Sequence, residues 1–325
     1  MEVFNLTLSQ MLMLFLLIFV GFLLRKKNIV PENSYKTISK MQTYVFAPAL
    51  SYYTLIRYCT VESFAKNSSL ILYGFILTVA AIAVAIPVSR LFVKAKDADS
   101  AYQQNVYKYA LTFSNWGYLG GYVLLQVFGS ETYFLYTMYT MLLRILTTGW
   151  GLYILIPKEQ GSSIRQNLIK GLTAPPMIAE FLGIICGFLG VYKFMPTFLL
   201  SALEKAGDCM GPMAMLLAGV VIGGNSVRSL ITDKKVYAVS LLRLIVIPSA
   251  MLLVLHLIGA PEMVSIFTLF AFASPLGLNT IVYPAAYGGD TKTGASMTMV
   301  SSVFAIATIP LMYLFFIEIL PKIWG

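Results

Sequence analysis

Two stretches of the sequence place an asparagine beside residues that interrupt helices. The first is Asn115-Trp116-Gly117-Tyr118-Leu119-Gly120-Gly121, and the second is Ser274-Pro275-Leu276-Gly277-Leu278-Asn279-Thr280. Glycine weakens a helix and proline removes a backbone donor, so each stretch predicts backbone groups that need other partners. Asparagine both donates and accepts hydrogen bonds. Because a helix N-terminus carries partial positive charge, these groups together could bind a small anionic molecule.

The candidate binding residues are the polar, aromatic and helix-breaking members of the two stretches and the residue that follows the first. They are Asn115, Trp116, Gly117, Gly120, Gly121, Tyr122, Ser274, Pro275, Asn279 and Thr280. A second interpretation is that the glycines only allow helices to pack closely, since Gly117 and Gly121 form a GxxxG pattern. That pattern recurs at Gly183/Gly187, Gly207/Gly211 and Gly219/Gly223. The matching position of an asparagine in both stretches favours the binding interpretation.

Charged residues within apolar segments are further candidates, because a charge costs at least about 2.5–3.5 kcal/mol to insert into a membrane. In the functional interpretation, Arg144 or Arg243 attracts a carboxylate, and Glu180 or Asp208 binds a proton or Na⁺. In the alternative, Glu180 pairs with an arginine as a structural bridge, while Asp208 and Lys205 lie at the outer surface. For Arg243 we favour a side chain that reaches back to the inner surface.

The composition around these residues is that of a membrane protein. Of 325 residues, 58% are hydrophobic and 11% are charged, against about 25% charged in soluble domains. This composition excludes a cytosolic enzyme, a disordered chain and a nucleic-acid-binding module, so no nucleic acid is expected as a partner. With three cysteines, one histidine, no phosphate-binding loop and no catalytic pair, neither a cofactor nor enzymatic activity is expected. The coupling ion, H⁺ or Na⁺, stays open.

Ten segments contain the run of about 20 mostly apolar residues that a membrane helix needs. They lie at about 8–24, 38–57, 69–93, 105–128, 131–156, 171–189, 197–223, 236–257, 263–287 and 294–320. The two asparagine stretches fall in the fourth and the ninth segments. The polar connections are short, so the sequence predicts an all-α integral membrane protein without a soluble domain.

The distribution of Lys and Arg predicts the orientation of these spans. If the N-terminus lies outside, 16 of the 23 fall at the inner ends and loops and 5 at the outer ones. Basic residues collect on the cytoplasmic side, so both termini are expected outside the cell membrane. The first apolar stretch has Glu2 before it and basic residues after it, which indicates a retained span rather than a signal peptide.

Ten spans divide into two repeats of five, expected at residues 1–157 and 158–325. Because five is odd, the second repeat must be inverted relative to the first. Weak internal similarity agrees with this division. Pro48 falls in the second span of the first half and Pro212 in the second span of the second half, and each half has one asparagine stretch in its fourth span. Interrupted helices at corresponding positions of two repeats are the strongest sequence indication of a transporter binding site.

Motifs over nearly the whole chain resemble one family in order and spacing. They are Gly21–Lys27, Phe46–Leu50, Asn115–Gly129, Gly207-Asp208, Pro212–Ala214, Pro275–Asp290, Ser301-Ser302 and Thr308–Pro310. The sequence resembles a bacterial member of the auxin efflux carrier family, which is related in fold to the bile acid/sodium symporters. The resemblance implies that spans 4 and 9 are interrupted and cross near the membrane centre. It also implies an elevator-type mechanism, in which a mobile domain carries the substrate past a scaffold built from spans 1, 2, 6 and 7. Two copies of the protein are expected to form a homodimer through that scaffold.

Two departures from the family pattern limit what can be carried over. Plant members usually have proline at both crossing points, where this sequence has Tyr122 and Thr280, so the interruption of span 4 is expected to rest on glycine. Plant members also have an acidic residue in span 3, and residues 70–88 contain none. Plant members export auxin, and bacterial relatives are associated with dicarboxylates. The expected function is secondary transport of a small organic anion, with an uncoupled channel or pore as the alternative.

Overall fold

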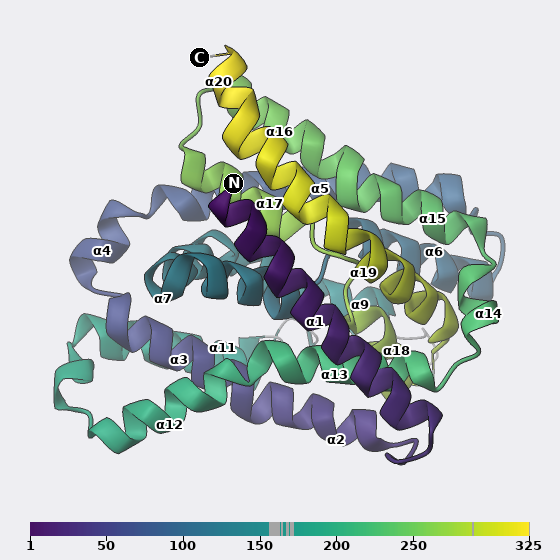
Figure 1. The fold of residues 1–325 in the computed structure, drawn as a ribbon, viewed down its shortest axis with the longest axis horizontal. Coiled ribbons are helices and arrows are strands. Elements are labelled where there is room, and N and C mark those ends of the chain that lie inside the picture. The colour runs from purple at the N-terminus through teal and green to yellow at the C-terminus, as the bar shows by residue number, and fades with distance from the viewer. Residues whose placement is uncertain (156–162, 164, 167–168, 170–171, 288, 325) are drawn as a thin grey trace.

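A computed structural model of the chain describes residues 1–155, 163, 165–166, 169, 172–287 and 289–324. Within these residues the regular structure is helical, apart from one isolated antiparallel bridge between Ser114 and Leu276 (Figure 1). The all-α prediction is therefore confirmed. The predicted boundary between the repeats, at residues 157 and 158, lies outside the described residues.

In the described part of the chain, five helical stretches are long and apolar enough to cross a membrane without interruption. Two are single helices, α1 (Glu2–Lys26) and α5 (Ser69–Phe92). The other three join shorter elements end to end. They are α12–α13 (Thr197–Asp208, Met210–Gly223), α15–η5–α16 (Lys234–Leu241, Leu242–Val246, Ile247–Leu257) and α19–η6–α20 (Lys292–Tyr313, Leu314–Ile319, Leu320–Trp324). Each coincides with one of the ten predicted spans.

The other predicted spans are helical but shorter or broken. The second is α2 (Ser34–Met41), η1 (Gln42–Phe46) and α3 (Ala47–Tyr58). The fourth is α6 (Ala98–Thr112), η2 (Trp116–Gly120) and the part of α7 (Gly121–Tyr139) that precedes Gly129, where the backbone leaves the helical conformation (φ 84°, ψ 175°). The fifth is the part of α7 after Gly129 together with α8 (Met141–Thr148) and α9 (Trp150–Leu155). The sixth is α11 (Pro175–Phe188), and the ninth is α17 (Glu262–Phe272) and α18 (Asn279–Tyr287). Short helices α4 (Val61–Lys66), η4 (Val191–Phe194) and α14 (Val227–Ile231) lie in connections.

A capping box fixes the start of α6, the first half of the fourth span. The Asp97 carboxylate accepts the Ser100 N–H at 2.8 Å, and the Ser100 hydroxyl oxygen accepts the Asp97 N–H at 3.0 Å. This exchange satisfies two N–H groups that the helix itself leaves without partners. The Ser100 N–H and the Ser100 hydroxyl, which also donates to the Asp97 carboxylate at 2.7 Å, hold the pKa of the Asp97 carboxyl below its ordinary value.

Small residues allow one group of helices to pack closely. Helix α1 lies along α13, and α3 lies along α11 and α12; in Figure 1, α2, α3, α11, α12 and α13 occupy the lower part of the molecule. Gly219 of α13 lies against the Ile18 carbonyl, and Gly187 of α11 lies against the Cys59 carbonyl. The packing interpretation of these GxxxG patterns is confirmed, because a methyl group at either glycine would collide with the backbone of the facing helix.

The fourth and ninth predicted spans are both interrupted, and their interruptions lie against each other. Helix α6 ends at Thr112 and η2 begins at Trp116, while α17 ends at Phe272 and α18 begins at Asn279. Between them the Asn115 N–H donates to the Pro275 carbonyl at 2.7 Å. This hydrogen bond gives the extended backbone a partner in place of one that it loses by leaving the helix, as a buried segment requires.

The expectation that glycines interrupt the fourth span is wrong. The chain leaves the helix at residues 113–115, before the first glycine of the motif, and Phe113 has an ordinary extended conformation (φ −112°, ψ 120°) that any residue can adopt. Gly117 and Gly120 lie in the π-helical turn η2 that follows. The interruption therefore depends on the facing segment. In the ninth span, Pro275 and Gly277 do lie within the interruption, as expected.

The two chain ends lie at the same face of the molecule. The amino group of Met1 forms an ion pair with the Glu318 carboxylate at 2.7 Å, next to the end of the last helix (Figure 1). The first helix and the last helical stretch therefore contact each other near these ends.

Candidate functional site

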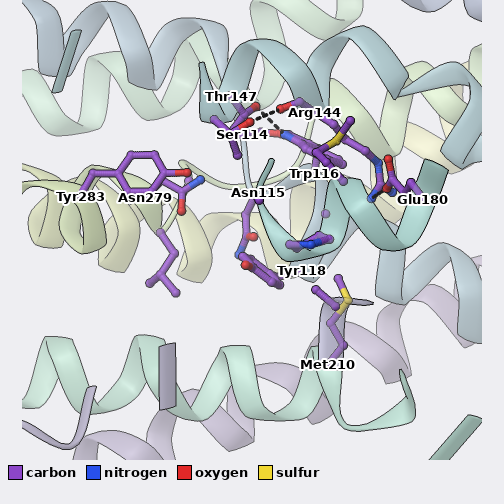
Figure 2. A pocket seen from close by; sticks show the side chains of 18 residues that line it. Ser114, Asn115, Trp116, Tyr118, Arg144, Thr147, Glu180, Met210, Asn279 and Tyr283 are labelled. Carbon is purple, nitrogen blue, oxygen red and sulfur yellow. Dashed lines mark hydrogen bonds and ion pairs between the residues drawn. The ribbon is translucent and has the colours of Figure 1, made fainter. Parts of the chain in front are cut away.

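A cavity of about 120 Å³ lies beside the meeting point of the two interrupted helices (Figure 2). Its wall contains residues from the start of η2, from the segment 277–279 and α18, and from α8, α11, α3 and α13. Segments from both halves of the chain thus surround one small, partly polar space. The cavity is the candidate binding site.

Four of the ten predicted binding residues line the cavity. These are Asn115, Trp116, Gly117 and Asn279. The Asn115 carboxamide makes no hydrogen bond to any described residue, although the residue is only 6% exposed, and it faces the cavity in Figure 2. The Asn279 side-chain N–H donates to the Tyr109 hydroxyl at 3.1 Å, which leaves its carbonyl oxygen as an acceptor. Both asparagines therefore present polar groups where a ligand would lie.

The predicted glycines divide into two kinds. A methyl group on Gly117 would meet nothing within 4 Å, so this residue borders open space. On Gly120 it would collide with the Phe270 carbonyl oxygen and the Ser274 hydroxyl of the other interrupted span. On Gly121 it would press against two tyrosine rings. The binding interpretation thus fits Gly117, and the packing interpretation fits Gly120 and Gly121.

The other predicted binding residues build the crossing or pack away from the cavity. The Ser274 hydroxyl donates to the Phe270 carbonyl at 2.7 Å, the Thr280 hydroxyl donates to the Gly277 carbonyl at 2.8 Å, and the Pro275 carbonyl accepts from Asn115. The ring of Tyr122 packs against Gly211. The structure therefore does not bring these four side chains to the cavity.

Arg144 and Glu180 form an ion pair in the wall of the cavity. Their side chains are 11% and 5% exposed. The Arg144 guanidinium lies over the Trp116 ring at 5.0 Å, and the Ser51 hydroxyl donates to the Glu180 carboxylate at 3.4 Å. Nε and Nη2 of Arg144 are buried and find no hydrogen-bond partner among the described residues. A guanidinium with unused donors is a strong receptor for a carboxylate.

The other two charged candidates lie elsewhere. Asp208 is exposed, pairs with Lys205 at 3.5 Å and does not line the cavity, which agrees with the alternative interpretation. The expectation for Arg243 is wrong, because its side chain does not reach the surface and is completely buried. No group of three or more His, Cys, Asp and Glu residues able to hold a metal ion occurs in the described part of the chain.

The backbone adds positive potential to the cavity. Asn115 immediately precedes η2–α7, and Asn279 is the first residue of α18, so the N-terminal ends of both helices adjoin the same space. The first N–H groups of a helix have no intrahelical acceptor, and together they carry about half a positive charge. With Arg144 alongside, the cavity is better suited to an anion than to a cation.

A second cavity, of about 220 Å³, continues from the first. Tyr118, Asn279 and Tyr283 line both, and the second extends to Ser39 and Gln42 of α2 and η1. This is the end of the molecule where Lys36 and Lys40 lie in sequence. The candidate site therefore extends toward the side that the charge distribution predicts to be cytoplasmic.

Several cavity residues were not predicted from the sequence. Thr147 and Thr148 follow Arg144 by three and four positions, and Tyr283 follows Asn279 by four, so each shares a helix face with a predicted residue. Thr147 also accepts a hydrogen bond from the Trp116 indole N–H at 3.3 Å. Helical spacing from the predicted residues would have identified them. Tyr118, between two predicted glycines in the first motif, supplies a phenol that had been expected from Tyr122.

Interrupted helices that meet beside a partly polar cavity are an arrangement expected of a membrane transport protein. The chain belongs to the family of membrane transport proteins, whose pattern it matches over residues 6–313. It is similar to a protein of Methanocaldococcus jannaschii named as the uncharacterized transporter MJ1031. The two are 22% identical over 307 residues, which are 94% of this chain and 97% of that protein. The family resemblance found in the sequence is confirmed, and the chain is a multi-pass membrane protein.

Proposed function

We propose that this protein is a secondary transporter of a small organic anion, a carboxylate. One observation carries the proposal: the N-terminal ends of both interrupted helices, with Asn115 and Asn279, adjoin one cavity that Arg144 also lines. Helix N-termini and a guanidinium each favour negative charge, and the asparagines can orient the remaining polar groups of a ligand.

We further propose ten crossings, arranged as two inverted repeats of residues 1–157 and 158–325, with both termini outside the cell membrane. In this arrangement spans 1, 2, 6 and 7 form the scaffold of a homodimer, and the remaining spans move as in an elevator. The cavity supports this proposal, because Ala47, Glu180 and Met210 line it from proposed scaffold helices and Asn115 and Asn279 from the crossing. Glu180 is the better candidate than Asp208 for carrying a coupling proton, since only Glu180 lines the cavity.

Two measurements test the proposal on the purified protein. Carboxylic acids are screened by thermal shift, because a ligand at free concentration L that binds the folded state stabilises it by RT ln(1 + L/Kd) and so raises its melting temperature as the ligand concentration exceeds Kd. Uptake of a radiolabelled dicarboxylate or aromatic acid is then measured in proteoliposomes. Saturable uptake supports a transporter, whereas conductance that never saturates supports a channel. No response to any carboxylate, with a response to cations or neutral solutes, would contradict the anion assignment.

Substitution of the asparagines is expected to abolish transport while leaving the protein folded. We expect Asn115→Ala to lower the uptake rate by about tenfold or more, because one hydrogen bond to a charged ligand contributes about 1.5–3 kcal/mol. Its melting temperature should stay that of the wild type, since the side chain bonds to no described residue. Asn279→Ala should show the same loss with slight destabilisation, because it also loses the bond to Tyr109.

The matched control is Asn225→Ala. Asn225 lies after α13, donates to the Val221 carbonyl at 3.1 Å and does not line the cavity, so normal uptake is expected. Normal uptake by both Asn115→Ala and Asn279→Ala would refute the site.

A further inference from the structure

A second positive charge lies inside the protein, against the opposite ends of the interrupted helices. Arg243 is completely buried, in the π-helical turn η5 of the eighth predicted span. It forms no ion pair with any carboxylate of the described chain, and its Nε and Nη1 find no hydrogen-bond partner there. A charge in such a place is expensive, so an intramembrane arginine without a carboxylate partner indicates a role.

The contacts of Arg243 place it at both helix C-termini of the crossing. Its Nη2 donates to the carbonyl of Thr112 at 3.4 Å, and Thr112 is the last residue of α6. Its guanidinium carbon lies 5.4 Å from the ring centre of Phe272, the last residue of α17. The last carbonyls of a helix have no intrahelical donor and carry partial negative charge. A cation at this position is therefore stabilised by the carbonyl end of α6, and it lies beside the last residue of α17.

Other carbonyls of the same helix ends are also satisfied by the chain itself. The Ser274 hydroxyl donates to the Phe270 carbonyl, and the Ser114 hydroxyl donates to the Ala271 carbonyl at 2.6 Å. In transporters with interrupted helices, such C-terminal carbonyls are where a Na⁺ ion is coordinated. Here donors of the protein, one of them permanently charged, already occupy them.

We propose that Arg243 is a positioning residue that supplies, as part of the chain, the cation required by the carbonyl ends of the two interrupted helices. The crossing then needs no bound Na⁺ to hold its geometry. The charges of the crossing are ordered: the carbonyl ends face Arg243, and the amide ends face the anion cavity. The inference rests on the proposed function in its transport measurements, whereas its melting measurements do not depend on that function.

The test compares Arg243→Lys, which keeps the charge, with Arg243→Met, which keeps much of the volume without it. The exposed Arg228→Met is the control. Melting temperature and proteoliposome uptake are measured in NaCl and in choline chloride at equal ionic strength. We expect the wild type to melt and transport equally in both salts. Arg243→Met should transport about 10²-fold more slowly, because a 1 Å misplacement of binding groups can cost that much, while Arg243→Lys retains most of the rate.

Either of two results would overturn the inference. One is a saturable rise in the melting temperature or the uptake rate of the wild type with Na⁺. The other is equal behaviour of the Lys and Met variants, which would show that charge is irrelevant at this position. If Arg243→Met does not fold, two measurements still test the inference. They are the melting of the wild type in NaCl against choline chloride, and the melting temperature of Arg243→Lys. If the wild type transports no carboxylate, the proposed function fails, but the effect of Na⁺ on melting still tests Arg243.

Discussion

Removal of the Arg144 guanidinium is expected to eliminate carboxylate transport. The substitution is made together with Glu180→Gln, because Arg144→Gln alone would leave the buried Glu180 carboxylate without its partner and destabilise the protein. We expect the double variant to lose about 10²-fold or more in uptake efficiency, since a buried charge-assisted contact contributes about 2–5 kcal/mol. Initial rates of uptake of a radiolabelled dicarboxylate into proteoliposomes give the comparison.

The single variant Glu180→Gln separates the roles of the two residues. It removes the carboxylate that competes for Arg144, so the thermal shift produced by a carboxylate should be at least as large as in the wild type. Asp208→Asn is the matched acid-to-amide control, because Asp208 is exposed and lies away from the cavity. Wild-type uptake by the double variant would remove Arg144 from the site. A loss of ligand binding in Glu180→Gln alone would assign recognition to the acid instead.

The second large effect is expected at the contact between the interrupted helices. A methyl group on Gly120 would overlap the backbone of the facing segment at Phe270, which cannot move without displacing the crossing. Gly120→Ala should therefore destabilise the protein by about 1–3 kcal/mol or more, as overpacked cores do. We expect a lower melting temperature in detergent and loss of uptake, measured on the same preparation.

Gly117→Ala is the control for this substitution, because it changes the same residue type in the same π-helical turn. Nothing lies within 4 Å of its added methyl group, and replacement of glycine by alanine favours helix by up to about 1 kcal/mol. Its melting temperature should match or exceed that of the wild type. If both variants melt alike, close approach at Gly120 does not stabilise the crossing.

Sequence reasoning located the interrupted helices because proline, glycine and asparagine have strong local effects. It identified Asn115 and Asn279 as binding-site candidates, and both line the cavity. One of its two interpretations of Glu180 was an ion pair with an arginine, because an acid within an apolar segment requires compensation, and the partner is Arg144. The lengths of the apolar runs also located the long helices: the span predicted at 69–93 coincides with α5 (Ser69–Phe92), and the span predicted at 8–24 lies within α1 (Glu2–Lys26).

The errors arose where distant segments determine local structure. The chain leaves the helix at Phe113 because the ninth span offers it a backbone partner, and no residue type at 113–115 indicates this. The burial of Arg243 was not predicted, because the groups that it contacts, the Thr112 carbonyl and the Phe272 ring, come from two other spans. The orientation of Tyr122 toward Gly211 depends likewise on packing between helices of the two halves. Contacts between residues of different spans cannot be predicted from the spacing of residue types within one span.

The ion pair between Arg144 and Glu180 has a kinetic consequence. Arg144 belongs to α8 and Glu180 to α11, which fall on opposite sides of the proposed sliding boundary. If the two sides move past each other, an unloaded protein must separate the charges with nothing to replace either partner, whereas a bound carboxylate can take the place of Glu180. The empty return step is then the slow one, so we expect solute on the far side to accelerate efflux, and the protein to work as an exchanger.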